Sequence, residues 1–96
     1  MRVAWARFTT VACPVQIEGQ LADGRWFYFR ARYSHAGVGI GADLQRAAVD
    51  YDAHGFHQRR VTSEEYAERF DAGMLSRAQA VELLGELLAE RLESAV

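Results

Sequence analysis

Residues 15–33 read VQIEGQLADGRWFYFRARY, and this stretch sets the architecture of the chain. Apolar and polar residues alternate on both sides of Ala22-Asp23-Gly24. Period-two alternation around an Asp-Gly turn predicts a β-hairpin. In the second strand of this hairpin, one face carries Phe27, Phe29 and Ala31, which suit a hydrophobic core. The other face carries aromatic and basic residues, namely Trp26, Tyr28, Arg30 and Arg32.

The register of the hairpin follows from the same pattern. A two-residue loop would place Ile17 opposite Arg30 and mix apolar with polar side chains on both faces. A three-residue loop places Ile17 opposite Phe29, so that the apolar residues fall on one side. Gly24 then takes the left-handed conformation that ends such a loop. The expected pairs are Val15–Ala31, Ile17–Phe29 and Gly19–Phe27 on the inner face, with Gln16–Arg30, Glu18–Tyr28 and Gln20–Trp26 on the outer face.

The composition is that of one small soluble globular domain. The chain has 96 residues and a formal net charge of −2, which gives no global attraction to nucleic acid or anionic membranes. All 11 basic residues are arginines, which favour planar and stacking contacts at an interface. The single cysteine, Cys13, cannot form an internal disulfide. We therefore expect a protein of the reducing cytoplasm.

We expect no membrane association. The run from Thr10 to Cys13 resembles a lipoprotein cleavage site, but the segment before it is short and is interrupted by Arg7. A signal peptide needs a longer unbroken apolar region. No stretch of the sequence is long enough to span a bilayer.

Two further strands are expected in the N-terminal half. β-Branched and aromatic residues over 3–11 predict a first strand, which Cys13-Pro14 interrupts. Residues 34–37 are typical of a turn, and Val38–Ile40 of a short strand that faces the core. Three glycines then line the outer face, where they leave room for neighbouring aromatic rings or for a ligand. These are Gly37, Gly39 and Gly41.

The remaining chain is mainly helical. Asp43 to Ala53 fits a helix with Asp43 as N-cap and Gly55 as stop, although its alternation also fits a strand; we favour the helix. Residues 56–61 are expected to be a connector or an edge strand. Capping boxes at Thr62–Glu65 and Ser76–Gln79 predict two more helices, one reaching about residue 71 and one over residues 77–93.

These elements predict an α+β fold in a single domain over residues 1–96, mainly β over 1–42 and mainly helical over 62–96. We expect a small antiparallel sheet of three to four strands with two to three helices packed on one face. The last helix has an apolar stripe wide enough to pack on the sheet and to form a homodimer. Its leucines are Leu83, Leu84, Leu87, Leu88 and Leu92.

The outer face of the hairpin is the candidate functional site. Tryptophan, tyrosine and arginine are enriched at the hot spots of protein interfaces. They also suit stacking on unpaired bases, although the net acidity and the absence of lysine disfavour nucleic acid. The alternative is that another element covers this face, or that the side chains stack on each other. The candidate partner-binding residues are Glu18, Trp26, Tyr28, Arg30 and Arg32.

A second cluster contains residues that can ligate a divalent metal. Its members are Asp50, Asp52, His54 and His57. Their spacing matches no established metal motif, and polar residues at a helix end explain them as well. We expect no metal, no cofactor and no catalytic residue, hence a protein that is not an enzyme. The alternative left open is a small metal-dependent or other enzyme that uses this cluster.

Three short runs in the N-terminal part form a pattern: CPVQIEG at residues 13–19, Asp23-Gly24, and FYFRAR at residues 27–32. Together they resemble small uncharacterised proteins of actinobacteria and their phages. The resemblance implies an accessory or inhibitor protein of phage or mobile-element type that binds a host protein, by analogy with anti-CRISPR proteins. The leading hypothesis is thus a small protein-binding module, with a single-stranded nucleic-acid binder as a further alternative.

Overall fold

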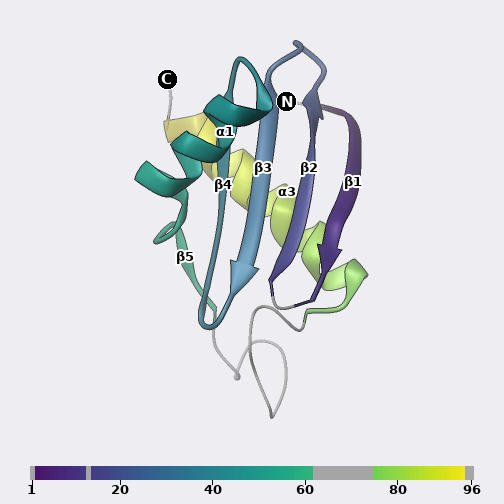
Figure 1. Cartoon of the computed structure of the whole chain (residues 1–96), viewed down its shortest axis with the longest axis vertical. Coiled ribbons are helices and arrows are strands. Elements are labelled where there is room, and N and C mark those ends of the chain that lie inside the picture. Colours follow the sequence, from purple (N-terminus) through teal and green to yellow (C-terminus); the bar gives the residue numbers. More distant parts are fainter. Residues whose placement is uncertain (1, 13, 62–74, 95–96) are drawn as a thin grey trace.

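The computed structural model describes residues 2–12, 14–61 and 75–94. Within these residues, five antiparallel strands lie side by side in chain order, and helical segments pack against the sheet (Figure 1). The α+β class is confirmed, with one strand more than the three to four predicted. The strands are β1 (Val3–Val11), β2 (Val15–Leu21), β3 (Trp26–Arg32), β4 (His35–Gly41) and β5 (Arg59–Arg60). The helical segments are α1 (Leu44–Asp50), its π-helical continuation η1 (Tyr51–Gly55), and α3 (Arg77–Ser94).

The β2–β3 hairpin has the predicted register. Ile17 lies opposite Phe29, and all six predicted pairs are present. The amide of Leu21 donates to the carbonyl of Arg25 at 2.8 Å, which closes a three-residue loop. Gly24 has a φ of +92°, a conformation that glycine adopts without steric cost. Face matching and loop chemistry therefore agree, as the sequence predicted.

β1 pairs with β2 through two β-bulges, each with one extra residue. Register shifts fall between Val3 and Trp5 and between Phe8 and Thr10. Between these shifts, Trp5 and Arg7 share the outer face with β2 residues, while Ala6 and Phe8 lie on the inner face. A simple alternation along β1 would have put Val3 and Trp5 on the same face. The bulge at Ala4 instead places Val3 on the same inner face as Phe8.

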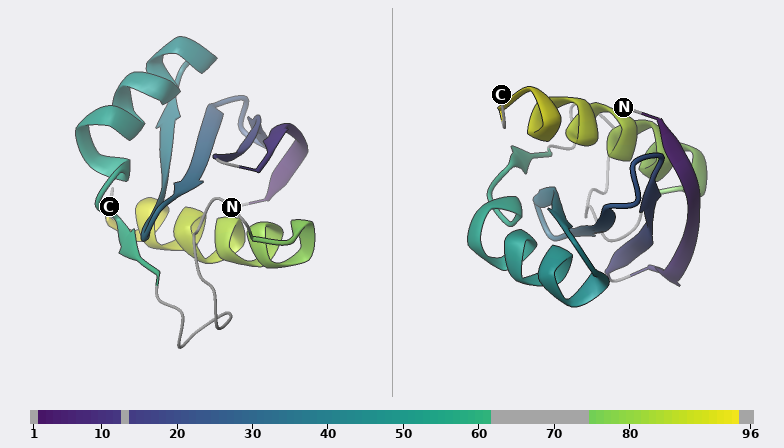
Figure 2. Two further views of the ribbon diagram at one scale, coloured as in Figure 1. Left: turned by 60° about the horizontal axis from the view of Figure 1, so that its bottom comes forward. Right: turned by 90° about the horizontal axis from the view of Figure 1, so that it is seen from above.

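The helical segments cover opposite faces of the sheet, which corrects the prediction that they share one face. α3 crosses the inner face, and its leucines join Phe27, Phe29 and Val38 in the hydrophobic core. α1 and η1 lie on the outer face, against β4 and part of β3 (Figures 1 and 2). The buried leucines of α3 are Leu83, Leu84, Leu87 and Leu88.

The glycines of β4 explain how α1 and η1 reach the outer face. A Cβ on Gly39 would overlap the carbonyl oxygen of Ala47 and the backbone nitrogen of Tyr51. Gly37 and Gly41 meet the backbone of the same helical segment in the same way. The space expected for aromatic rings or for a ligand is therefore occupied by helix backbone.

One loop prediction needs correction, and the structure decides between the two alternatives left open for another segment. The β3–β4 turn lies at Tyr33-Ser34 and not over residues 34–37, so that β4 begins at His35. Tyr33 has a φ of +55°, a left-handed conformation that glycine more often adopts in such a turn. After η1 the chain forms β5, whose two residues pair with His35 and Ala36 of β4. This short edge strand was one of the two predicted possibilities for residues 56–61.

Helix starts follow the predicted capping chemistry. The Asp43 carboxylate accepts from the amide of Arg46 at 2.8 Å, and the helix that we favoured continues through η1 to Gly55. Ser76 and Gln79 form the reciprocal capping box at the start of α3, with bonds of 3.1 and 3.0 Å. The predicted capping box at residues 62–65, its helix, and Cys13 lie outside the described residues.

Candidate functional site

The outer face of the sheet is divided into a covered half and an open half. Over β4, the backbone of α1 and η1 lies directly on the strand. The boundary is the pair Tyr28 and Tyr51, whose rings meet edge to face with centroids 5.4 Å apart. On this outer face, α1 and η1 lie on the β4 side, whereas α3, the other described helix, lies on the opposite face of the sheet (Figure 2). We call the remaining part of the outer face the open half; its side chains are Trp5, Arg7, Gln16, Glu18, Gln20, Trp26 and Tyr28.

Two tryptophans form the upper part of the open half. Trp5 from β1 and Trp26 from β3 meet edge to face, with centroids 5.4 Å apart, across Gln20 of β2. The indole Nε1 of Trp5 donates to Oε1 of Gln20 at 2.9 Å. Trp5 is 37% exposed although its polar atom is bonded. The pair is therefore an ordered apolar surface with its hydrogen-bond donor satisfied.

Arg7 and Glu18 form an ion pair at the centre of the open half. Nε of Arg7 donates to Oε1 of Glu18 at 2.8 Å, and a second guanidinium nitrogen contacts the same oxygen. Glu18 is only 8% exposed, so that it holds Arg7 and offers little contact area of its own. The guanidinium also lies 5.8 Å from the ring centroid of Trp5, within cation–π range.

Tyr28 is fixed by a chain of hydrogen bonds across three strands. Thr10 donates to Oε1 of Gln16 at 3.1 Å, and Nε2 of Gln16 donates to the hydroxyl of Tyr28 at 2.8 Å. Burial raises the pKa of Tyr28, and the nearby Arg30 acts in the opposite direction. The tyrosine therefore stays a neutral hydroxyl over the physiological range.

The predicted arginines lie at the border of the open half. Arg30 lies beside Tyr51. Burial is the largest cause that raises the pKa of Tyr51 to about 12, and the Arg30 guanidinium offsets part of this rise. Arg32 lies over the ring of Tyr33, 4.7 Å from its centroid. Both arginines are half-buried against aromatic rings. The predicted stripe is thus split: Trp26 and Tyr28 remain with the open half, whereas Arg30 and Arg32 pack toward the β3–β4 side.

Sequence reasoning missed Trp5 and Arg7. Both belong to a strand whose alternation is interrupted by the extra residues at Ala4 and Thr9, and period-two counting misplaces them relative to Val3. A tryptophan in a predicted edge strand was the available signal. Their pairing with Gln20 and Glu18 depends on the extra residue at Thr9 and could not be read from the sequence.

The cluster of potential metal ligands, which carried the alternative hypothesis of a metal-dependent enzyme, is dispersed. The carboxylate of Asp50 accepts from the amide of Ile40 at 2.8 Å and from Arg91 at 2.6 Å. The ring of His57 meets Phe56 and His35 edge to face, with centroids 4.6 and 5.3 Å apart. Asp52 and His54 are exposed on η1. Among the described residues, no three His, Cys, Asp or Glu side chains are grouped so that they could hold a metal.

Comparison with known proteins gives no relative. No family of proteins matches the chain, and no match is found among curated proteins or among solved structures. None of the helices in the described ranges is long and apolar enough to cross a membrane.

Proposed function

We propose that this chain is a non-enzymatic protein-binding module that recognises its partner through the open half of the outer sheet face. One observation carries the proposal: Trp5 and Trp26 form an ordered aromatic pair on the outer face, in which Trp5 is 37% exposed. The opposite face of the same strands already supplies the core. The stability of the fold therefore does not require a second apolar surface here. Recognition of a partner explains why the aromatic pair is present.

The order of the open half supports tight binding. A rigid aromatic side chain loses little conformational entropy when a partner covers it. Gln20 fixes Trp5, and Gln16 fixes Tyr28, through side-chain hydrogen bonds of 2.9 and 2.8 Å. A partner can bury these rings without leaving the indole nitrogen of Trp5 unpaired. Preorganised tryptophan, tyrosine and arginine side chains are the usual anchors of protein interfaces.

The charges of the open half favour a protein over nucleic acid. Arg7 is neutralised by Glu18, and Arg30 lies beside Tyr28 and Tyr51. Phosphate binding draws most of its affinity from several free cations. We further propose that the partner is a host protein, as for the phage-type accessory proteins that the hairpin sequence resembles. The protein would then act by occupying a surface of that partner.

Affinity capture with paired variants tests the proposal. Immobilised wild-type protein, Trp5→Ala and Val49→Ala are incubated with lysate from the native host, and retained proteins are identified by mass spectrometry. Val49 is the control because it is an exposed apolar residue on α1, 61% exposed, away from the open half. We expect that at least one protein is retained by wild type and by Val49→Ala but is lost from Trp5→Ala. Equal retention by all three would place the binding surface elsewhere.

Salt dependence then separates the classes of partner. For a protein that buries the tryptophans, we expect the affinity to change little between 50 and roughly 200 mM salt. For nucleic acid, the logarithm of the affinity falls linearly and steeply with the logarithm of the salt concentration. Nuclease-sensitive retention with such a slope would replace the protein partner by single-stranded nucleic acid.

A further inference from the structure

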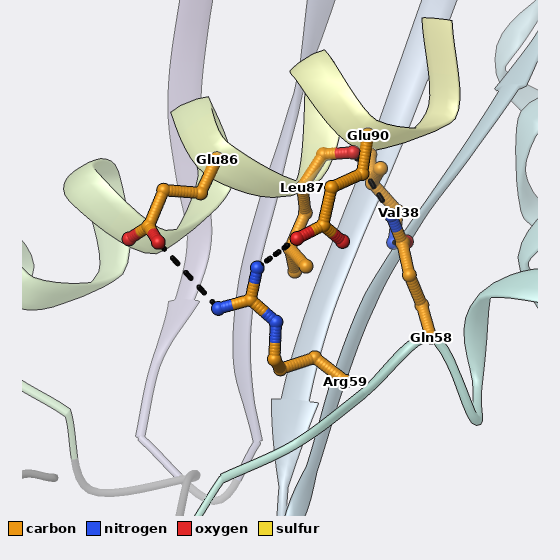
Figure 3. Close-up of polar contacts among 6 residues, drawn as sticks. All are labelled: Val38, Gln58, Arg59, Glu86, Leu87 and Glu90. Carbon is orange, nitrogen blue, oxygen red and sulfur yellow. Dashed lines mark hydrogen bonds and ion pairs between the residues drawn. The ribbon is translucent and has the colours of Figure 1, made fainter. Parts of the chain in front are cut away.

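The two edges of the sheet are treated differently. The β4 edge is blocked: β5 pairs with His35 and Ala36, and side chains accept from the next amides along the strand. Val38 donates to Oε1 of Gln58 at 2.9 Å (Figure 3), and Ile40 donates to Asp50 at 2.8 Å. These acceptors replace a missing strand. A sheet edge blocked in this way cannot accept another chain.

The β1 edge has no such protection in the described structure. β1 is nine residues long, pairs with β2 on one side, and exposes apolar side chains. Beside it, an apolar groove of about 290 Å³ runs between the inner face of β1 and α3. The helix side of the groove includes Val81, which is 54% exposed, and Gly85, around which a Cβ would meet nothing within 4 Å. An edge strand with one side open, next to an apolar groove, is suited to strand addition.

We propose that the occupant of this edge is a second copy of the chain, bound by antiparallel β1–β1 pairing about a two-fold axis at Ala6. Opposite residues in an antiparallel pair share a face, so that only registers centred on a single residue keep inner with inner. The regular part of β1 between its bulges is residues 5–8. This limits the axis to Trp5, Ala6, Arg7 or Phe8.

The repulsion of like charges and the positions of the bulges select Ala6 among these positions. An axis at Arg7 would set two guanidinium groups opposite each other, and an axis at Trp5 or Phe8 would bring a bulge residue into the pair directly beside the axis. With the axis at Ala6, the first bulge residue, Ala4, lies two positions away from the axis. With the axis at Ala6, Trp5 of each copy lies opposite Arg7 of the other. Within one copy this arginine already lies 5.8 Å from the ring centroid of Trp5, so that the same cation–π pairing recurs across the axis. Two alanines at the axis leave the strands free to approach.

The second copy would also cover the groove. Phe8 lies on the inner face, under Arg77 at 5.5 Å from its ring centroid, and the exposed Val81 lies on α3 beside it. Pairing at β1 brings the same apolar residues of the second copy to this place. The dimer therefore uses the N-terminal half of α3 together with the strand edge. It does not use the leucines predicted to mediate it, because four of them are buried in the core of one chain and Leu92 packs against that core.

Sedimentation equilibrium over a concentration series tests the dimer. We expect a monomer–dimer equilibrium for wild type. Ala6→Lys should raise the dissociation constant by about tenfold or more, because two ammonium groups would face each other at the axis. Ala53→Lys is the control, since it adds the same charge at an exposed alanine on η1. Thermal melts of dilute protein show that both variants fold. A wild-type protein that stays monomeric up to millimolar concentration would overturn the proposal.

Cysteine crosslinking tests the register. In a Cys13→Ser background, Ala6→Cys places two thiols directly opposite, with Cα atoms about 4.5–5.5 Å apart, which a disulfide can bridge. Ala4→Cys is the control, because the register sets Ala4 opposite Phe8. We expect rapid oxidation to a covalent dimer for Ala6→Cys alone. Equal rates for the two variants, or faster crosslinking of Ala4→Cys, would contradict the Ala6 register. Failure of partner capture through Trp5 would leave both results unchanged.

Discussion

Gly39 shows how one residue type decides where a helix lies. Its missing side chain lets the backbone of α1 and η1 lie directly on β4. Gly85, in contrast, faces open space in the middle of α3. Both residues are glycines inside regular elements, yet only the first is required by its surroundings.

Substitution of these two glycines by alanine should have opposite effects. At Gly39 the new Cβ would overlap backbone atoms, which cannot move aside as a flexible side chain would. We expect Gly39→Ala to lower the free energy of unfolding by about 3 kcal/mol or more. Gly85→Ala should raise it by about 0.5–1 kcal/mol, because alanine favours the helix. Urea denaturation measures both; a neutral Gly39→Ala would show that α1 does not lie on β4.

Tyr51 makes stability depend on alkaline pH. Burial raises its pKa in the folded state to about 12, above the ordinary value of 10.0. Between these values the unfolded chain loses the phenolic proton while the folded chain keeps it, so that the stability present below pH 10 falls as pH rises toward 12. We expect Tyr51→Phe to lose less stability over this window than wild type. Melting temperatures from pH 8 to pH 12 check this, and parallel curves would contradict it.

Between elements, side chains of the segment after η1 connect β4 to α3 (Figure 3). Gln58 accepts from the amide of Val38, and its Nε2 donates to the carbonyl of Leu87 at 2.9 Å. The next residue, Arg59, forms ion pairs with Glu86 and Glu90 on the same helix. Asp50 adds a third connection through Arg91. The β4 edge is thus closed by bonds that also fix the C-terminal half of α3.

Removal of the Gln58 amide should be costly for its size. Gln58→Leu leaves the amide of Val38 and the carbonyl of Leu87 without this partner, at a cost of about 1–3 kcal/mol per buried unsatisfied group. Gln45→Leu, at an exposed position of α1, is the matched control and should change stability by less than about 0.5 kcal/mol. Chemical denaturation compares the two. Equal effects would mean that water replaces the amide of Gln58 without cost.

Elements whose signals are local were predicted, and those that depend on distant contacts were not. The hairpin register follows from face matching around Gly24, and the start of α3 follows from Ser76 and Gln79. The bulges of β1 have no local signal, because their extra residues are Ala4 and Thr9. The placement of α1 on the outer face was missed because glycines indicate space and do not show what fills it.

At the scale of the whole molecule, the sheet separates two different packing tasks. α3 and the inner face build the core, and α1 with η1 seals the β4 side of the outer face. Among the residues that the structure describes, what remains is the open half with Trp5, Arg7 and Trp26, bordered by the β1 edge, which pairs with no further strand there. A second copy bound at that edge would place two open halves side by side. Binding to a multivalent partner would then gain from avidity.

Trp26→Ala, measured for stability and for partner affinity in the same preparation, tests the binding function most directly. Phe29 is the reference because it is fully buried on the opposite face of β3, and Phe29→Ala should cost about 3–5 kcal/mol. We expect Trp26→Ala to lower the melting temperature by about 10 °C or less. The same variant should weaken binding of the captured partner by about 30-fold or more, as loss of a hot-spot residue does. A loss of stability equal to that of Phe29→Ala, or a folded Trp26→Ala protein that binds the partner as tightly as wild type, would contradict the assignment of the open half as the binding surface.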